Sequence, residues 1–357
     1  MKIKPMTKFA ILTLSLVLVA CAGGGSEEAG CPAIDGREIN VVATTPMIGE
    51  FVSQVGGENI NLTVLMPPEA NPHTYEPAPQ DAGTIAEADL VFYTGLLYEP
   101  AALVKLLENS ACSTDILSEV GESVFPIEFK EGGHDDHDDH DDEEGHDDHD
   151  DEEGHDDEEG HDDEEGHDDE EGHDDHEGHN HGAYDPHFWF DPSRVAYAAE
   201  YIESRLIQFD PENESSYKSS ADSFVSELND LTKQVSELIS TVPSQNRKLI
   251  TTHESLGYLE AKFGLEVLST IIPSLNSANE ISPSDLAGVI DVIEDNNVKV
   301  IFIESEAPSV YSETIVAETG IKPVTGLYVE TLKPGQSYSE FLISNVTLIT
   351  ENLQDTD

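Results

Sequence analysis

Basic side chains are scarce in this sequence. Sixteen Lys and Arg residues stand against 75 Asp and Glu, and the formal net charge is −59. Residues 131–181 hold 30 of the acidic side chains and no basic one, so the rest of the chain still carries a net charge of −29. Nucleic acids and anionic membranes are bound through basic surface patches. The composition therefore argues against both as partners.

The sequence also has no obvious apolar run of about 20 residues, the length that crosses a bilayer. Phe9–Ala20 has twelve residues and follows three early lysines, which predicts a signal peptide over residues 1–20. The letters LVAC at 18–21 resemble a bacterial lipobox, so Cys21 is expected to carry lipid and to anchor the protein to a membrane. Residues 21–37 would then form a Gly- and Ser-containing tether. The alternative is ordinary signal cleavage with Cys21 as a bystander.

Only three cysteines are present, and none lies in a C-x-x-C motif. If Cys21 is acylated, Cys31 and Cys112 are the remaining pair. Disulfides persist in exported proteins, so we expect a bridge between these two, with two unpaired thiols as the alternative.

Two parts of the chain alternate strand-like and helix-like patterns, which predicts parallel sheets covered by helices. The expected strands are 38–43, 60–66, 90–93, 248–252, 266–268, 298–303 and 322–325. The expected helices are 46–55, 79–88, 101–107, 193–208, 256–263, 283–296, 310–319 and 336–352. Between the two parts, apolar residues recur every three to four positions from Tyr217 to Leu238. Asp210 and Pro211 are favoured as N-cap and first residue of this long helix.

The fold class is therefore α/β, with two lobes joined by one long helix. We assign the N-terminal lobe to residues 38–208, the connecting helix to 209–242 and the C-terminal lobe to 243–357. Each lobe is expected to have its own core.

The N-terminal lobe is interrupted by a segment of His, Asp, Glu and Gly, placed at 131–182. Its repeated hexamer HDDEEG contains no apolar position, so we expect a disordered insertion. Dense carboxylates concentrate cations, which favours an auxiliary, weak metal-binding role; a metal-level sensor and a solvated spacer are the alternatives. Twelve histidines lie there: His134, His137, His140, His146, His149, His155, His161, His167, His173, His176, His179 and His181.

Outside this insertion the sequence has three histidines, His73, His187 and His253. Each lies in a loop next to a strand end or a helix start. Ligands of open α/β sheets bind at the carboxyl ends of strands, and imidazole suits a borderline-soft divalent cation. The alternative for any one of them is a structural, hydrogen-bonded histidine.

The segments NPHTYEP at 71–77 and DPHFWFDP at 185–192 resemble the first two ligand motifs of the ZnuA-like cluster A-I metal-binding proteins of bacterial ABC importers. An acidic, His-rich insertion between them is also similar to that family. The resemblance covers about residues 39–353 and implies two lobes on a rigid helix, with a metal site in the interlobe cleft.

By position, the resemblance implies that His73, His187 and His253 are metal ligands, with Glu330 as the fourth. Glu304 and Glu306 compete with Glu330, because LYVETL is a short motif. Manganese-binding relatives usually have a carboxylate at the third position. Three imidazoles and one carboxylate favour Zn²⁺, with Mn²⁺ as the alternative.

The resemblance implies an extracytoplasmic, lipid-anchored and monomeric binding protein that captures Zn²⁺ and delivers it to an ABC permease in the membrane. A zinc hydrolase is the first alternative, although HExxH and GxSxG are absent from the sequence. A role in cell adhesion is the second, and no feature of the sequence favours it independently.

Overall fold

The computed structural model describes residues 31, 34, 36–129, 184–276, 280–306 and 310–354. The predicted signal peptide, Cys21 with its expected lipid and the twelve histidines of the acidic insertion lie outside the described residues. Within the described part of the chain, no helix combines the length and the apolar character needed to span a membrane.

The predicted alternation of strands and helices is confirmed, with shifts at several ends. The strands are β1 Ile39–Ala43, β2 Ile60–Val64, β3 Leu90–Tyr93, β4 Leu117–Glu119, β5 Lys248–His253, β6 Glu266–Ile272, β7 Val300–Glu304 and β8 Lys322–Leu327. The helices are α1 Pro46–Gly56, α2 Pro79–Ala86, α3 Ala101–Ser110, α4 Pro192–Phe209, α5 Glu214–Ser240, α6 Gly257–Phe263, α7 Pro283–Asp295, α8 Val310–Thr319 and α9 Tyr338–Gln354.

The N-terminal lobe is built on one parallel sheet in the order β2-β1-β3-β4. Successive side chains of a strand point to opposite faces, and both faces here are apolar. Val41 and Ala43 of β1 belong to the cluster formed with α1, α4 and α5, whereas Val42 joins α2 and α3 on the other face. The sheet is therefore covered by helices on both sides, and its loops are free to form a site at the strand ends.

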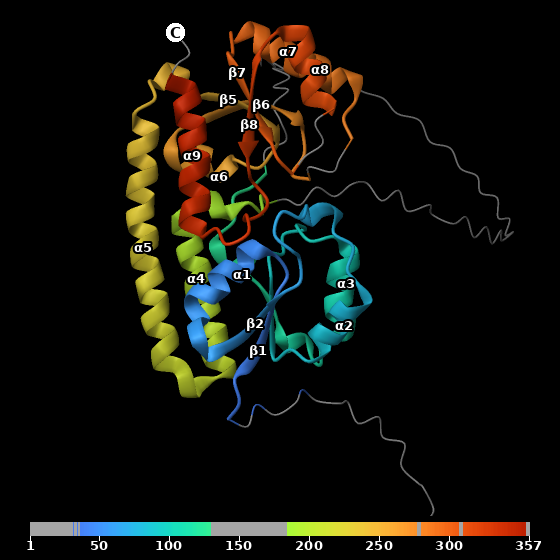
Figure 1. Ribbon diagram of the computed structural model, residues 1–357, viewed down its shortest axis with the longest axis vertical. Coiled ribbons are helices and arrows are strands. Elements are labelled where there is room, and N and C mark those ends of the chain that lie inside the picture. Colours follow the sequence, from blue (N-terminus) through green and yellow to red (C-terminus); the bar gives the residue numbers. More distant parts are fainter. Residues whose placement is uncertain are drawn as a thin grey trace, which may run out of the picture.

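Helix α5 is the predicted connector and runs alongside both lobes (Figure 1). Its 27 residues correspond to a rod of about 40 Å. The predicted start was wrong in detail: residues 211–213 form a 3-10 turn, and the helix begins at Glu214. Asp210 caps no backbone N–H of this turn through its side chain, because its carboxylate accepts hydrogen bonds from Asn213 and Tyr217.

The C-terminal lobe contains two parallel strand pairs, β5-β6 and β7-β8. Strands β5 and β7 lie side by side. They are joined by side chains: the Thr252 hydroxyl accepts from Glu304 N, and the Glu304 carboxylate accepts from His253 N. Helices α7 and α8 cover the outer face, while α6 and α9 lie toward α5.

The largest apolar cluster is shared by both lobes, which differs from the expectation of one core per lobe. It includes Val41 of β1, Phe224 of α5 and Phe302 of β7 in one connected set. Phe51 of α1 also packs edge-on against Tyr338 of α9, with ring centroids 5.2 Å apart. The lobes are therefore held against each other by continuous packing.

A disulfide joins Cys31 to Cys112. It ties the segment before β1 to the chain that follows α3.

Candidate metal site

Four side chains meet where the two lobes face each other. His73 lies in a short 3-10 turn after β2, and His187 directly precedes another such turn at Phe188–Phe190. His253 is the last residue of β5, and Glu330 lies in the loop after β8. His73 follows β2, His253 ends β5 and Glu330 follows β8, so three of the four lie at the carboxyl ends of parallel strands. The site therefore takes two side chains from each lobe.

The four ligand atoms all lie within 4.8 Å of one another. Glu330 Oε1 lies 3.0 Å from His73 Nε2 and 2.9 Å from His253 Nε2. Glu330 Oε2 lies 3.4 Å from His187 Nε2. Tetrahedral bonds of 2.0–2.1 Å to zinc place donor atoms about 3.3–3.4 Å apart. The three distances to the Glu330 oxygens are thus close to the spacing that a four-coordinate cation needs.

His187 is oriented by the residue two positions before it. Asp185 Oδ1 accepts hydrogen bonds from both the backbone N and the ring Nδ1 of His187, each at 2.8 Å. Because Nδ1 donates to Asp185 in this arrangement, Nε2 is the ring nitrogen that faces the cluster and that can bind a metal once its own proton has left. Asp185 is itself confined, since the Tyr258 hydroxyl donates to its carbonyl and Gly257 packs against its carboxylate.

His253 is oriented in the same way by a residue from β7. Glu304 Oε2 lies 2.5 Å from His253 Nδ1, and Glu304 Oε1 accepts from His253 N. Both side chains are fully buried. Glu304 therefore contacts the nitrogen of His253 that faces away from the cluster.

The Glu330 loop is held from both lobes. Tyr98, on the loop after β3, places its hydroxyl 3.0 Å from Glu330 Oε2. Trp189 donates from Nε1 to the carbonyl of Val329 at 2.8 Å. From the C-terminal lobe, Glu306 Oε1 accepts from the backbone N of Val329 and Glu330. These contacts fix where the carboxylate stands.

The charges of the site are strongly coupled. Burial lowers the pKa of His187, but the hydrogen bond to Asp185 and the nearby charge of Glu330 outweigh it and raise the pKa to about 9. Burial also lowers the pKa of His253, but the charges of Glu304 and Glu330 outweigh it. They raise this pKa well above its ordinary value. Burial raises the pKa of Glu330, and the three imidazoles more than reverse this, so it lies well below its usual range.

The donor set fits a divalent cation. The Nε2 atoms of His187 and His253 are buried and lack hydrogen-bond partners. Both atoms lie within ion-pair distance of the Glu330 carboxylate, but neither is aligned with it for a hydrogen bond. Buried polar atoms are rarely left unsatisfied, and a metal ion that replaced the protons of these two imidazole nitrogens would satisfy both of them.

Known proteins resemble this chain over most of its length. The family model described as zinc-uptake complex component A, periplasmic, matches residues 41–352. The chain belongs to this family. It is therefore a metal-binding component of an uptake system and not an enzyme.

Two relatives match nearly end to end. The high-affinity zinc uptake system protein ZnuA of Bacillus subtilis is 26% identical, over 97% of this chain and 96% of its own. The manganese ABC transporter substrate-binding lipoprotein PsaA of Streptococcus anginosus is 25% identical, over 98% and 99%. The periplasmic zinc-binding protein TroA of Treponema pallidum shares the fold, with a TM-score of 0.70 at 20% identity, over 88% of this chain and 99% of its own.

Sequence reasoning had named Glu304 and Glu306 as competitors of Glu330. Within the described residues, the cluster of potential ligands contains Glu330 and neither competitor. Glu304 contacts the Nδ1 side of His253. Burial and the negative charges of Glu330 and Glu304 raise the pKa of Glu306 to about 8. Tyr98 and Trp189 were missed. Trp189 stands two residues after His187 in the segment DPHFWFDP, and this nearness was the available signal.

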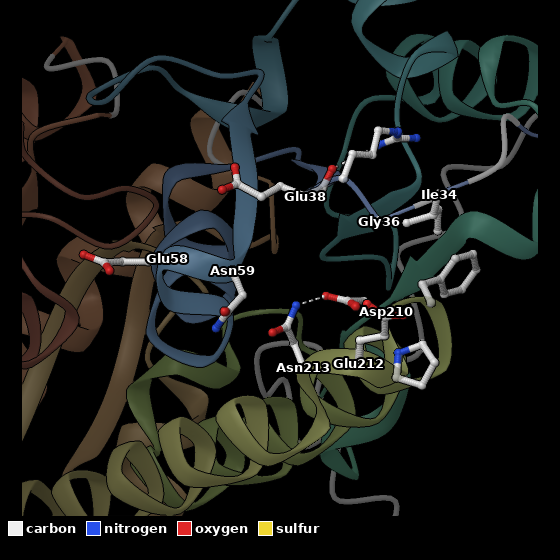
Figure 2. Close-up of a pocket in the computed structure, with 11 residues that line it drawn as sticks. Ile34, Gly36, Glu38, Glu58, Asn59, Asp210, Glu212 and Asn213 are labelled. Carbon is white, nitrogen blue, oxygen red and sulfur yellow. Dashed lines mark hydrogen bonds between the residues drawn. The ribbon is translucent and has the colours of Figure 1, made fainter.

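A separate surface hollow of about 380 Å³ lies by the turn between α4 and α5 (Figure 2). Four acidic residues line it: Glu38, Glu58, Asp210 and Glu212. The Asp210 carboxylate is already hydrogen-bonded to Asn213, as the dashed line shows, and to Tyr217. The hollow belongs to the amino-terminal side of β1, away from the strand ends that carry the metal cluster.

Proposed function

We propose that this chain captures Zn²⁺ outside the cytoplasm, as the substrate-binding protein of an ABC importer, and delivers it to the membrane permease. His73, His187, His253 and Glu330 are the proposed ligands. The observation that carries the proposal is the pair of buried, unpartnered Nε2 atoms beside the Glu330 carboxylate. Four protein ligands also leave no open position for the water of a catalytic zinc.

The choice of zinc over manganese is supported by the donor types. Relatives named for zinc and for manganese are similarly close to this chain, so likeness alone favours neither metal. Manganese prefers oxygen ligands, whereas imidazole suits zinc. Three imidazoles and one carboxylate favour zinc. His253 is the decisive donor, because a carboxylate at this position would give two nitrogen and two oxygen ligands.

Metal content and competition titration test this proposal. We expect purified protein lacking residues 134–181 to bind one Zn²⁺ tightly and Mn²⁺ more weakly. His253→Glu adds an oxygen donor and should shift the preference toward Mn²⁺. His253→Ala should weaken zinc binding strongly. A His253→Ala variant with undiminished zinc affinity would remove this residue from the site.

The proposal has three further parts. Cys21, outside the described residues, would carry the lipid that anchors the protein. The protein would act as a monomer. The histidines between 134 and 181 would form weak sites that collect zinc when it is scarce. Labelling with a radioactive fatty acid tests the anchor: the label should be lost in Cys21→Ala, and unchanged incorporation would refute it.

A further inference from the structure

The two oxygens of the Glu330 carboxylate have different surroundings. Oε1 lies 3.0 and 2.9 Å from the Nε2 atoms of His73 and His253. Oε2 lies farther from its imidazole, at 3.4 Å from His187 Nε2, and it faces the hydroxyl of Tyr98 at 3.0 Å. Only one of the two oxygens therefore contacts a hydroxyl donor.

The Tyr98 hydroxyl has a second neighbour, the carbonyl oxygen of Glu330, also at 3.0 Å. A hydroxyl has one proton to donate. Hydrogen bonds to an ionised acceptor are about twice as strong as those between neutral groups. The proton is therefore directed to the carboxylate oxygen Oε2 when Glu330 is ionised.

Tyr98 cannot easily move away from this position. Its ring is buried, with its centroid 5.0 Å from that of His73 and 5.3 Å from that of Trp189. The loop before it is fixed by the buried Glu99 carboxylate, which accepts hydrogen bonds from the backbone N of Thr94 and Gly95.

The backbone of that loop is also unusual. Leu96 and Leu97 both have positive φ, at 53° and 62°. Non-glycine residues adopt such angles at a cost of about 1–3 kcal/mol, which the surrounding structure must offset. These two strained residues directly precede Tyr98, whose hydroxyl contacts the Glu330 carboxylate.

A carboxylate can bind a cation through one oxygen or through both. Zinc sites are usually four-coordinate, whereas oxygen-preferring ions such as Mn²⁺ occupy octahedral sites with more oxygen ligands. We propose that Tyr98 is a positioning residue for metal selectivity: its hydroxyl occupies Oε2, so that Glu330 offers Oε1 alone. This inference rests on the proposed function, because it assumes that Glu330 is a ligand.

Tyr98→Phe tests the proposal, since it keeps the ring and removes the donor. Affinities for Zn²⁺ and Mn²⁺ are measured by competition titration on protein lacking residues 134–181. We expect the ratio of zinc to manganese affinity to fall about tenfold. Co²⁺ in place of zinc gives a second readout, because its visible absorption is intense with four ligands and weaker with more. That absorption should weaken in Tyr98→Phe.

Tyr217→Phe is the matched control. The Tyr217 hydroxyl also donates to a buried carboxylate, Asp210 Oδ2, at 2.6 Å, but at the start of α5. Its removal should leave the affinity ratio and the Co²⁺ spectrum unchanged. In a Glu330→Gln background only one side-chain oxygen remains, so adding Tyr98→Phe should no longer change the ratio.

The results separate the two proposals. Equal weakening of both metals in Tyr98→Phe, with an unchanged Co²⁺ spectrum, would reduce Tyr98 to a packing role and overturn this inference alone. A parent protein that binds neither metal would instead overturn the proposed function, before any variant is compared.

Discussion

Removing the Asp185 carboxylate should weaken metal binding without touching a ligand. Asp185 Oδ1 holds both the backbone N and the ring Nδ1 of His187 at 2.8 Å. In Asp185→Ala the imidazole is free to turn or to change tautomer, and its Nδ1 loses its acceptor. Loss of such an outer partner typically costs 10–100-fold in metal affinity, or about 1.4–2.8 kcal/mol.

Asp89→Ala is a control of the same residue type. Asp89 is also buried and accepts from the backbone N of Asn40 and from Arg37, on the far side of the N-terminal lobe. Both variants lose hydrogen bonds to a charged group, worth about 1.5–3 kcal/mol each, so both should unfold at lower temperature. Only Asp185→Ala should bind zinc more weakly.

Two measurements on the same samples test this reasoning: thermal unfolding without metal, and zinc competition against a chromophoric chelator. If Asp185→Ala lost stability as Asp89→Ala does but kept full zinc affinity, the Asp185 carboxylate would support the fold only, and the orientation of His187 would come from packing.

Three further predictions concern the same site. A methyl group on Gly257 would stand 2.7 Å from Asp185 Oδ2, so Gly257→Ala should weaken zinc binding several-fold, whereas Gly288→Ala, which has open space around it, should not. Asp185 and Glu330 raise the pKa of His187 to about 9 in the absence of metal, and a metal must displace the proton that this pKa describes; zinc affinity should therefore fall as pH drops below 9. Calorimetry in buffers of different ionisation enthalpy should show at least one proton released per zinc at pH 7, and no release would contradict the pKa direction. Deleting residues 134–181 should abolish weak zinc sites and leave one tight site; loss of the tight site would mean that the insertion supplies a ligand in place of Glu330.

The sequence predicted most elements because their periodicity is local. Strand β3 and helix α8 begin and end where the pattern placed them. Strand β4 was missed because three residues carry too little pattern. Strand β6 was expected to end at Leu268, because Ser269 and Thr270 interrupt the apolar run. The strand continues to Ile272, because these two residues still pair with β5.

The gathering of the four candidate ligands could be anticipated in part, because His73 and Glu330 follow parallel strands and His253 ends one. Their hydrogen-bond partners could not. Glu304 lies 51 residues from His253, and Tyr98 lies 232 residues from Glu330. No local pattern relates positions so far apart. Whether a nearby carboxylate is a ligand or supports one depends on which ring nitrogen it faces, and that is a matter of tertiary geometry.

The shared apolar core explains why a site between two lobes can still have fixed dimensions. If each lobe had its own core, as the sequence suggested, His73 and Glu330 would be joined only through the connecting helix. Instead one apolar cluster continues from β1 through α5 to β7. Separating the lobes would expose this surface, at about 25 cal/mol for each Å². Ligands from the two lobes are therefore held near one another by packing that lies behind them.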